Sequence, residues 1–148
     1  MNTYKLNGGC HCGNVRVELT LTGAPAACIP RVCDCDFCRK HGASYISDPQ
    51  GTLRFEVKEE RDFGKYKQGS GVSDCLICRN CGVLVGFSYY EEGRLYATIN
   101  SKVVEGEPLF GEEISVSPKL LTEEKKTERW KEKWFRDVIV HADQRITP

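Results

Sequence analysis

The sequence predicts a mainly β protein, a sandwich of short strands with a C-terminal helix. Apolar and polar residues alternate from Val15 to Leu21, which is the period of a strand with one buried face. Polar or glycine-containing turns separate several further short apolar runs. From Thr122 onwards the apolar spacing becomes that of a helix. The chain has 148 residues, and we expect residues 1–148 to form a single domain.

The first strand is expected to begin at Tyr4 and to run into a glycine-bracketed segment that contains Cys10 and Cys12. Because glycine allows the backbone to turn tightly, this segment can form a knuckle that aims two thiolates inward. Two thiolates are half of the ligand set of a tetrahedral zinc ion. The strand at 15–21 follows, and the chain then turns at 23–25.

Three more thiols lie close together at Cys33, Cys35 and Cys38. Zinc prefers four tetrahedral ligands, so three cysteines in one turn leave one position for another group. A short helical turn is expected over 36–41, because Gly42 can end it.

Short strands continue through the middle of the chain. We expect them at 43–47, 53–57, 63–68, 73–77, 83–88 and 94–100. A second knuckle, with Cys78 and Cys81, lies between two of them, and the two knuckles can share one zinc ion. Residues 102–117 are expected to form an irregular loop or an edge segment.

The last predicted element is a helix with Thr122 as its N-cap. Trp130, Trp134 and Val138 fall four residues apart, which places them on one apolar stripe. We expect this stripe to pack on the sheet. A helix that binds a partner protein is the alternative.

The composition excludes several classes of function. Lysine plus arginine and aspartate plus glutamate each total 21, a balance that argues against binding nucleic acid or an anionic membrane. No stretch approaches the roughly 18 apolar residues of a membrane span, and no signal-peptide core is seen. We therefore expect a cytoplasmic protein. Its nine cysteines are odd in number and mostly closely spaced, which favours metal binding over disulfides.

Three cysteine motifs in this order carry a family resemblance. They are G-x-C-x-C-G-x-V at 8–15, C-x-C-x2-C-R at 33–39 and C-x2-C-G at 78–82. Together they resemble the glutathione-dependent formaldehyde-activating enzyme family, which also contains centromere protein V. The resemblance implies an Mss4-like, zinc-containing β-sandwich with two zinc ions per chain.

The resemblance also implies a role for each cysteine. Cys10, Cys12, Cys78 and Cys81 would hold a structural zinc, and Cys33, Cys35 and Cys38 would hold a catalytic zinc. The spacing of the cysteines points to the same division, because two knuckles close a four-thiolate site whereas one loop of three leaves a position open.

A zinc ion held by three thiolates suits a soft sulfur ligand better than it suits the formation of hydroxide. We therefore predict a zinc-dependent carbon–sulfur lyase. It would form or cleave a glutathione–aldehyde adduct such as S-(hydroxymethyl)glutathione, with glutathione as the expected small thiol substrate. Asp34 or Asp36 could move a proton, or could only solvate the loop. Arg39 and Lys40 could attract the carboxylates of glutathione, or could balance the charge of the zinc–thiolate cluster.

The alternative is a non-catalytic, zinc-stabilised binding module. In that case His41, Cys28 or Cys75 would close the second site, and His41, three residues after Cys38, is the strongest candidate. The module would then act in protein or chromatin interactions, although the neutral charge balance argues against direct DNA binding. The oligomeric state does not follow from the sequence.

Overall fold

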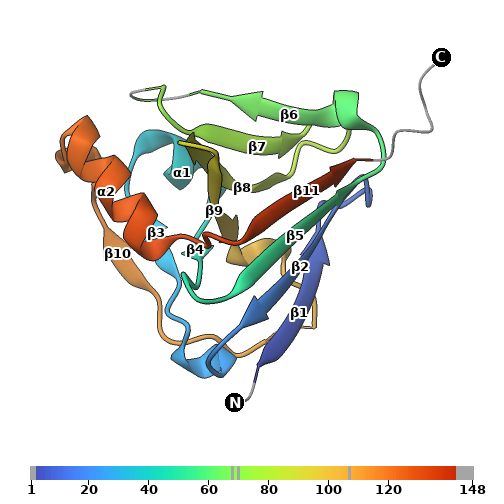
Figure 1. Ribbon diagram of the computed structural model, residues 1–148, viewed down its shortest axis with the longest axis horizontal. Helices are drawn as coiled ribbons and strands as arrows, with labels where there is room; N and C mark the ends of the chain where they lie inside the picture. The colour runs from blue at the N-terminus through green and yellow to red at the C-terminus, as the bar shows by residue number, and fades with distance from the viewer. Residues whose placement is uncertain (1–2, 68, 70, 107, 143–148) are drawn as a thin grey trace.

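The computed structural model describes residues 3–67, 69, 71–106 and 108–142, which form two β-sheets and two α-helices (Figure 1). The smaller sheet has the strand order β1-β2-β5-β11. Its strands are β1 (Tyr4–Gly9), β2 (Val15–Leu21), β5 (Thr52–Val57) and β11 (Val138–Ala142). Pairing is antiparallel except that β11 runs parallel to β5.

The larger sheet has the strand order β10-β3-β4-β9-β8-β7-β6. Its strands are β3 (Arg31–Cys33), β4 (Tyr45–Ile46), β6 (Phe63–Tyr66), β7 (Asp74–Cys78), β8 (Leu84–Glu91), β9 (Arg94–Asn100) and β10 (Ile114–Val116). Only β10 and β3 are parallel neighbours in it. Because β10 lies at the edge of this sheet, the expectation of an edge segment within 102–117 is confirmed.

The main core lies between the two sheets. The apolar residues of β2 are all buried, as their alternation predicts, and the register places Val17 opposite Phe55 and Leu19 opposite Leu53. Side chains of the larger sheet, such as Ile99, complete the same cluster. The predicted mainly β sandwich is therefore confirmed.

The larger sheet is also buried on its other face, where both helices lie. These are α1 (Asp36–His41) and α2 (Glu123–Lys133), which are seen at the same end of the molecule in Figure 1. Trp130 and Trp134 form a second apolar cluster with Phe87 and Tyr89 of β8. The prediction that the C-terminal helix packs on the sheet is confirmed. Strand β8 is buried on both faces, because Val85 faces the main core while Phe87 and Tyr89 face the cluster that contains Trp130 and Trp134.

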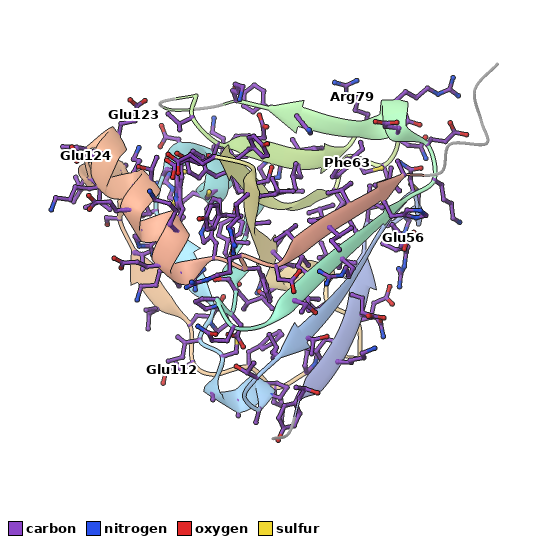
Figure 2. All side chains as sticks on the ribbon, in the orientation of Figure 1. Glu56, Phe63, Arg79, Glu112, Glu123 and Glu124 are labelled. Carbon is purple, nitrogen blue, oxygen red and sulfur yellow. The ribbon has the colours of Figure 1, made fainter. Side chains whose placement is uncertain are left out.

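Local signals set both ends of α1 and the first residue of α2. The first helix spans 36–41 as expected and ends at Gly42, which has a φ of 62°. The Thr122 hydroxyl accepts a hydrogen bond from the backbone N–H of Lys125, so Thr122 is the N-cap of α2. The next two residues, Glu123 and Glu124, lie in the first turn of this helix (Figure 2), where negative charge is favourable.

The predicted helical position of Val138 is wrong. Helix α2 ends at Lys133, Trp134 has an extended ψ of 160°, and Val138 is the first residue of β11. A tertiary contact ends the helix, because Phe135 exchanges two backbone hydrogen bonds with Ala97 of β9. The β-branched run from Val138 to Val140 then suits a strand beside β5.

Short connections complete the chain. The 3-10 turns are η1 (Pro25–Ala27), η2 (Glu60–Asp62), η3 (Ser101–Val103) and η4 (Pro118–Leu120). The predicted strand at 63–68 ends at Tyr66, and its last position, Gln68, lies outside the described residues, as does Ser70 in the turn that follows. Within the part of the chain that the structure describes, no helix has both the length and the apolar character needed to cross a membrane.

Candidate active site

The two knuckles bring four cysteine sulfurs together between the sheets. Cys10 and Cys12 follow β1 of the smaller sheet, whereas Cys78 ends β7 of the larger one and Cys81 follows it. The four sulfurs lie within 4.8 Å of one another. The sulfur of Cys12 lies 3.7 Å from that of Cys10 and 3.6 Å from that of Cys78. These separations match the roughly 3.8 Å between neighbouring sulfurs around a tetrahedral zinc with bonds of about 2.3 Å.

Glycines give the two knuckles their shape. Gly13 follows Cys12 with a φ of 86°, and Gly82 follows Cys81 with a φ of 82°. A side chain with a Cβ atom rarely adopts such values, so glycine at these positions lets each knuckle turn back into its next strand. The donor set, the spacing and the backbone all fit a four-coordinate zinc ion.

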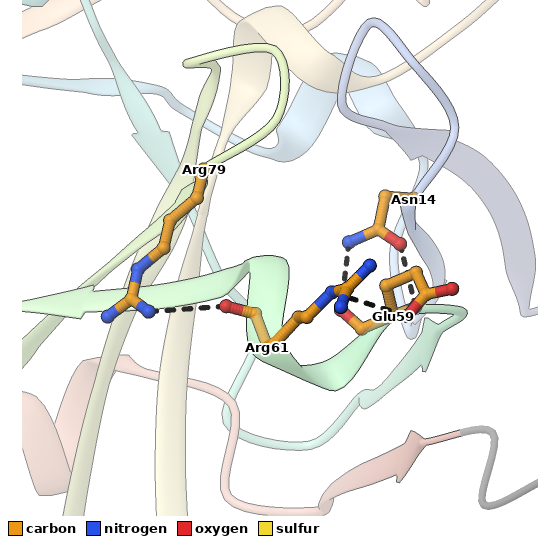
Figure 3. A network of polar contacts seen from close by, with 4 residues as sticks. All are labelled: Asn14, Glu59, Arg61 and Arg79. Atoms are coloured by element: carbon orange, nitrogen blue, oxygen red, sulfur yellow. Dashed lines mark hydrogen bonds and ion pairs between the residues drawn. The ribbon is translucent and has the colours of Figure 1, made fainter. Parts of the chain in front are cut away.

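A polar network holds both knuckles in place (Figure 3). Asn14, just after the first knuckle, exchanges two hydrogen bonds with the backbone of Glu59, at 2.8 and 3.2 Å. Arg79 of the second knuckle donates to the carbonyl oxygen of Arg61 at 3.2 Å, and the Arg61 guanidinium lies 3.7 Å from the Glu59 carboxylate. Residues 59–61 therefore connect a knuckle of one sheet to a knuckle of the other.

The second cluster consists of Cys33, Cys35 and Cys38, whose sulfurs also lie within 4.8 Å of one another. Cys33 ends β3, Cys35 is the N-cap of α1, and Cys38 lies one turn later with its side chain buried. The Cys35 sulfur accepts a hydrogen bond from the backbone N–H of Cys38 at 3.4 Å. Helix α1 thus folds the chain back so that three thiols face one point.

Hydrogen bonds tune these thiols. Interaction with the Cys38 thiol lowers the pKa of Cys33, and interaction with Cys33, together with burial, raises the pKa of Cys38. The hydroxyl of Tyr45 donates to the Cys38 sulfur at 3.2 Å. Burial raises the pKa of Tyr45, so this phenol remains protonated and remains a donor. The three thiols and their donor fit a metal ion that keeps one position free.

The three-cysteine cluster faces a cavity of about 450 Å³. Its aromatic lining consists of Phe37, Tyr45, Tyr66, Phe87, Trp130 and Trp134. Neighbouring rings are in contact, with Phe37 5.5 Å from Tyr66 and Trp130 5.0 Å from Trp134 between centroids. A molecule in this cavity would meet the cysteines at one end and aromatic walls around it.

Cations also line this cavity, namely Arg31, Lys119, Lys126 and Arg129. Burial lowers the pKa of Arg31 to about 10, and the nearby charge of Arg129 acts in the same direction. Burial also lowers the pKa of Arg129. None of these four cations was predicted from the sequence as a site residue. Arg31 carried one usable signal, because it lies two positions before Cys33 in a strand and so shares its face.

The residues expected to surround the second cluster lie in different places. Arg39 and Lys40 are exposed on α1 and do not line the cavity, so the lining cations come from other elements. Asp36 lines the cavity, whereas Asp34 accepts a hydrogen bond from Ser117 and lies 3.9 Å from Lys119.

The three residues considered as a fourth ligand do not join the cluster. His41 is exposed and packs on Phe37, Cys75 is fully buried in the second apolar cluster, and Cys28 packs against the main core. Across the described ranges, no fourth cysteine, histidine or carboxylate groups with all three sulfurs.

A family model for glutathione-dependent formaldehyde-activating enzymes matches residues 5–116, which is more than half of the chain. The chain belongs to this family. The match includes all seven clustered cysteines, so the resemblance carried by the three motifs is confirmed.

Solved structures support the fold of this family member. A crystal structure of a Rhodobacter sphaeroides protein from a structural genomics programme matches with a TM-score of 0.55 and 25% sequence identity. The match covers 73% of this chain and 99% of that one. No curated protein matches the chain.

The family match ends before the C-terminal part of the cavity wall. Pro118, Lys119, Lys126, Arg129, Trp130 and Trp134 all line the cavity, yet they lie beyond residue 116. The three cysteines of the cavity therefore lie in the part of the chain that matches the family, whereas the cavity wall formed by residues 118–134 lies outside that match.

Proposed function

We propose that this protein is a zinc-dependent carbon–sulfur lyase that forms or cleaves a glutathione–aldehyde adduct such as S-(hydroxymethyl)glutathione. The observation that carries this proposal is the position of the three-cysteine cluster at the wall of a cavity of about 450 Å³. A structural site would instead be closed by a fourth side chain.

The proposed metal content is two zinc ions per chain. Cys10, Cys12, Cys78 and Cys81 would hold a structural ion, and Cys33, Cys35 and Cys38 would hold the catalytic one. When bound at the second cluster, zinc supplies a Lewis acid that favours the thiolate form of a substrate thiol.

The side chains around the cluster prepare it for this chemistry. The Tyr45 hydroxyl draws electron density from the Cys38 sulfur, and aromatic side chains line the cavity beside the three cysteines. In the forward direction the substrate sulfur bonds to the aldehyde carbon, the carbonyl π electrons move to oxygen, and that oxygen takes up the proton the thiol has lost. Cleavage is the reverse of these steps.

We further propose that residues 1–148 act as one domain and that the protein works in the cytoplasm. Thiolates in both clusters need a reducing compartment, which supports that location. None of the nine cysteines, all of which lie within the described ranges, forms a disulfide.

Cobalt substitution tests whether the fourth metal position accepts a thiol. Each cobalt–thiolate bond adds charge-transfer absorption in the near ultraviolet, so glutathione should raise this absorption by the amount of one further thiolate. S-methylglutathione keeps the peptide but has no thiol, and it should leave the absorption unchanged. With formaldehyde added, the zinc enzyme should accelerate exchange between free and hydroxymethylated glutathione, measured by NMR.

The His41→Ala variant is the matched control for a closed site. It should leave the cobalt spectrum and its response to glutathione unchanged, because His41 is exposed and packs on Phe37. If glutathione leaves the cobalt spectrum unchanged and the His41→Ala substitution alters it, His41 is the fourth ligand. This result would contradict the lyase proposal.

A further inference from the structure

Two guanidinium groups line the cavity without an acidic partner. Arg31 and Arg129 are both partly buried. Among the described residues, neither has a carboxylate within ion-pair distance. Lys119, in contrast, has Asp34 as a neighbour at 3.9 Å.

Neutral groups hold Arg31 in position. Its guanidinium donates to the hydroxyl of Ser47 at 2.8 Å and lies 3.3 Å from that of Thr98. Thr98 is itself 2% exposed and is held by its own hydrogen bond to the carbonyl oxygen of Ile46. The Arg31 side chain is therefore oriented before any ligand binds, and its donors that are not used by hydroxyls remain available to the cavity.

Arg129 approaches the same cavity from α2. It precedes Trp130, which packs on Trp134 and on Tyr89 and so fixes this part of the helix against β8. The two arginines thus come from different elements, β3 and α2, and only the packing of the helix on the sheet brings them to one cavity.

This arrangement is costly unless an anion is present. Two like charges that are partly removed from water repel each other and lose hydration. An anion between them relieves both effects, and the planar fork of a guanidinium matches a carboxylate with two parallel hydrogen bonds. The Asp36 carboxylate is exposed at the cavity wall, and the four lining cations outnumber it even when the net negative charge of a zinc ion held by three thiolates is added.

We propose that Arg31 and Arg129 form a carboxylate-binding subsite that holds the peptide part of the thiol substrate while its sulfur lies at the three cysteines. This inference rests on the proposed function for the identity of the substrate. It adds that α2, which lies beyond the family match, selects a substrate with a carboxylate.

S-methylglutathione tests the subsite independently of metal–thiolate chemistry, because it carries both carboxylates of glutathione but no thiol. Its affinity for the zinc-loaded protein would be measured by calorimetry for the wild type and for Arg129→Gln. The variant should bind about tenfold more weakly, an effect between that of an exposed ion pair and that of a fully desolvated one. Arg31→Lys, which keeps the charge and loses the fork, should also bind more weakly.

Lys125→Gln is the matched control. Lys125 lies on the same helix, is exposed and does not line the cavity, so this variant removes a positive charge without touching the subsite. It should bind S-methylglutathione as the wild type does. Equal weakening by Lys125→Gln and Arg129→Gln would show a general charge effect and would overturn the proposal.

The glycine ethyl ester of S-methylglutathione identifies the carboxylate. If the ester binds the wild type as weakly as the parent binds Arg129→Gln, the subsite holds the glycine carboxylate. If the ester binds like the parent, and Arg129→Gln weakens both, the subsite holds the γ-glutamyl carboxylate. An unchanged affinity for S-methylglutathione in Arg129→Gln overturns the inference. If that variant also loses zinc, the arginine only balances the charge of the zinc–thiolate cluster.

The outcome is separable from that of the proposed function. A cobalt spectrum that does not change when glutathione is added would contradict the proposed lyase function. The dependence of S-methylglutathione affinity on Arg129 would still report on the anion subsite.

Discussion

The contact between Tyr45 and Cys38 is the most direct link between the cavity wall and the three-cysteine cluster. The Tyr45 hydroxyl lies 3.2 Å from the Cys38 sulfur, and the ring is 6% exposed. A hydrogen bond to a thiolate stabilises it against protonation, because it favours the charged form. Tyr45 is therefore a positioning residue that acts through a proposed metal ligand rather than through the substrate.

We expect Tyr45→Phe to weaken zinc binding at the second cluster by about tenfold at neutral pH, the lower end of the effect of removing such partners. Without the donor, protons compete better for Cys38 and the sulfur becomes more electron-rich. The cobalt charge-transfer band should accordingly move to longer wavelength. Tyr66→Phe, which changes another hydroxyl on the cavity wall, should alter neither quantity, and an identical response of the two variants would contradict this role.

At the scale of the element, helix α2 is held by aromatic packing. Trp130 is 8% exposed and its ring lies 5.2 Å from that of Tyr89 and 5.0 Å from that of Trp134. We expect Trp130→Ala to lower the free energy of unfolding by about 3–5 kcal/mol, as is usual when a large buried aromatic side chain is removed. Urea unfolding in excess zinc measures this, with the exposed Glu128→Ala as the control on the same helix.

A pH-dependent contact also fastens α2 to the sheet. Lys131 donates to the Glu91 carboxylate at 2.9 Å, and this hydrogen bond, with a second from Tyr89, holds the pKa of Glu91 below its usual value of 4.5. A carboxyl group with a lowered pKa in the folded state adds stability that is complete above its unfolded pKa. That stability is lost as the pH falls through the folded value.

Glu91→Gln should therefore be less stable than the wild type above about pH 4.5, and the difference should shrink as the pH is lowered further. Urea unfolding of both proteins measures this difference, in the same buffers and down to the lowest pH at which both retain their zinc. A difference that grows on acidification would contradict the assignment.

At the scale of the whole molecule, the four-cysteine cluster connects the two sheets, whereas the three-cysteine cluster lies at one end of the larger sheet. We therefore expect metal binding at the first cluster to be coupled to folding. We expect Cys81→Ser to unfold or aggregate the protein. Cys35→Ser should remain folded, because serine can replace the N-cap of α1, but it should lose one zinc ion and the activity.

Thermal unfolding and metal analysis of the two variants test this contrast. Equal losses of thermal stability would favour a module in which both zinc ions are structural.

Metal removal should follow the same division. We expect two zinc ions per chain, and a mild chelator should remove one of them first, because a site with a free position exchanges its metal more readily than a closed site. Metal analysis during the titration measures this order. A single ion held by all seven cysteines would contradict both sites.

The sequence was sufficient for features that depend on near neighbours. The alternation in β2, the cap at Thr122 and the glycine after α1 each act within a few residues, so their patterns predict the elements that the structure shows. The cysteine spacings likewise separated a four-thiol set from a three-thiol set, because a knuckle or a loop brings its thiols together locally.

Tertiary structure alone determined which distant residues meet. Val138 shares helical spacing with Trp134, yet backbone pairing of Phe135 with Ala97 ends the helix and places Val138 in a strand. Arg129 reaches the cavity only because Trp130 packs its helix on β8, and Arg39, next to the cysteines in sequence, faces solvent. A side chain's neighbours across a cavity depend on how whole elements pack, and no short-range pattern in the chain records that packing.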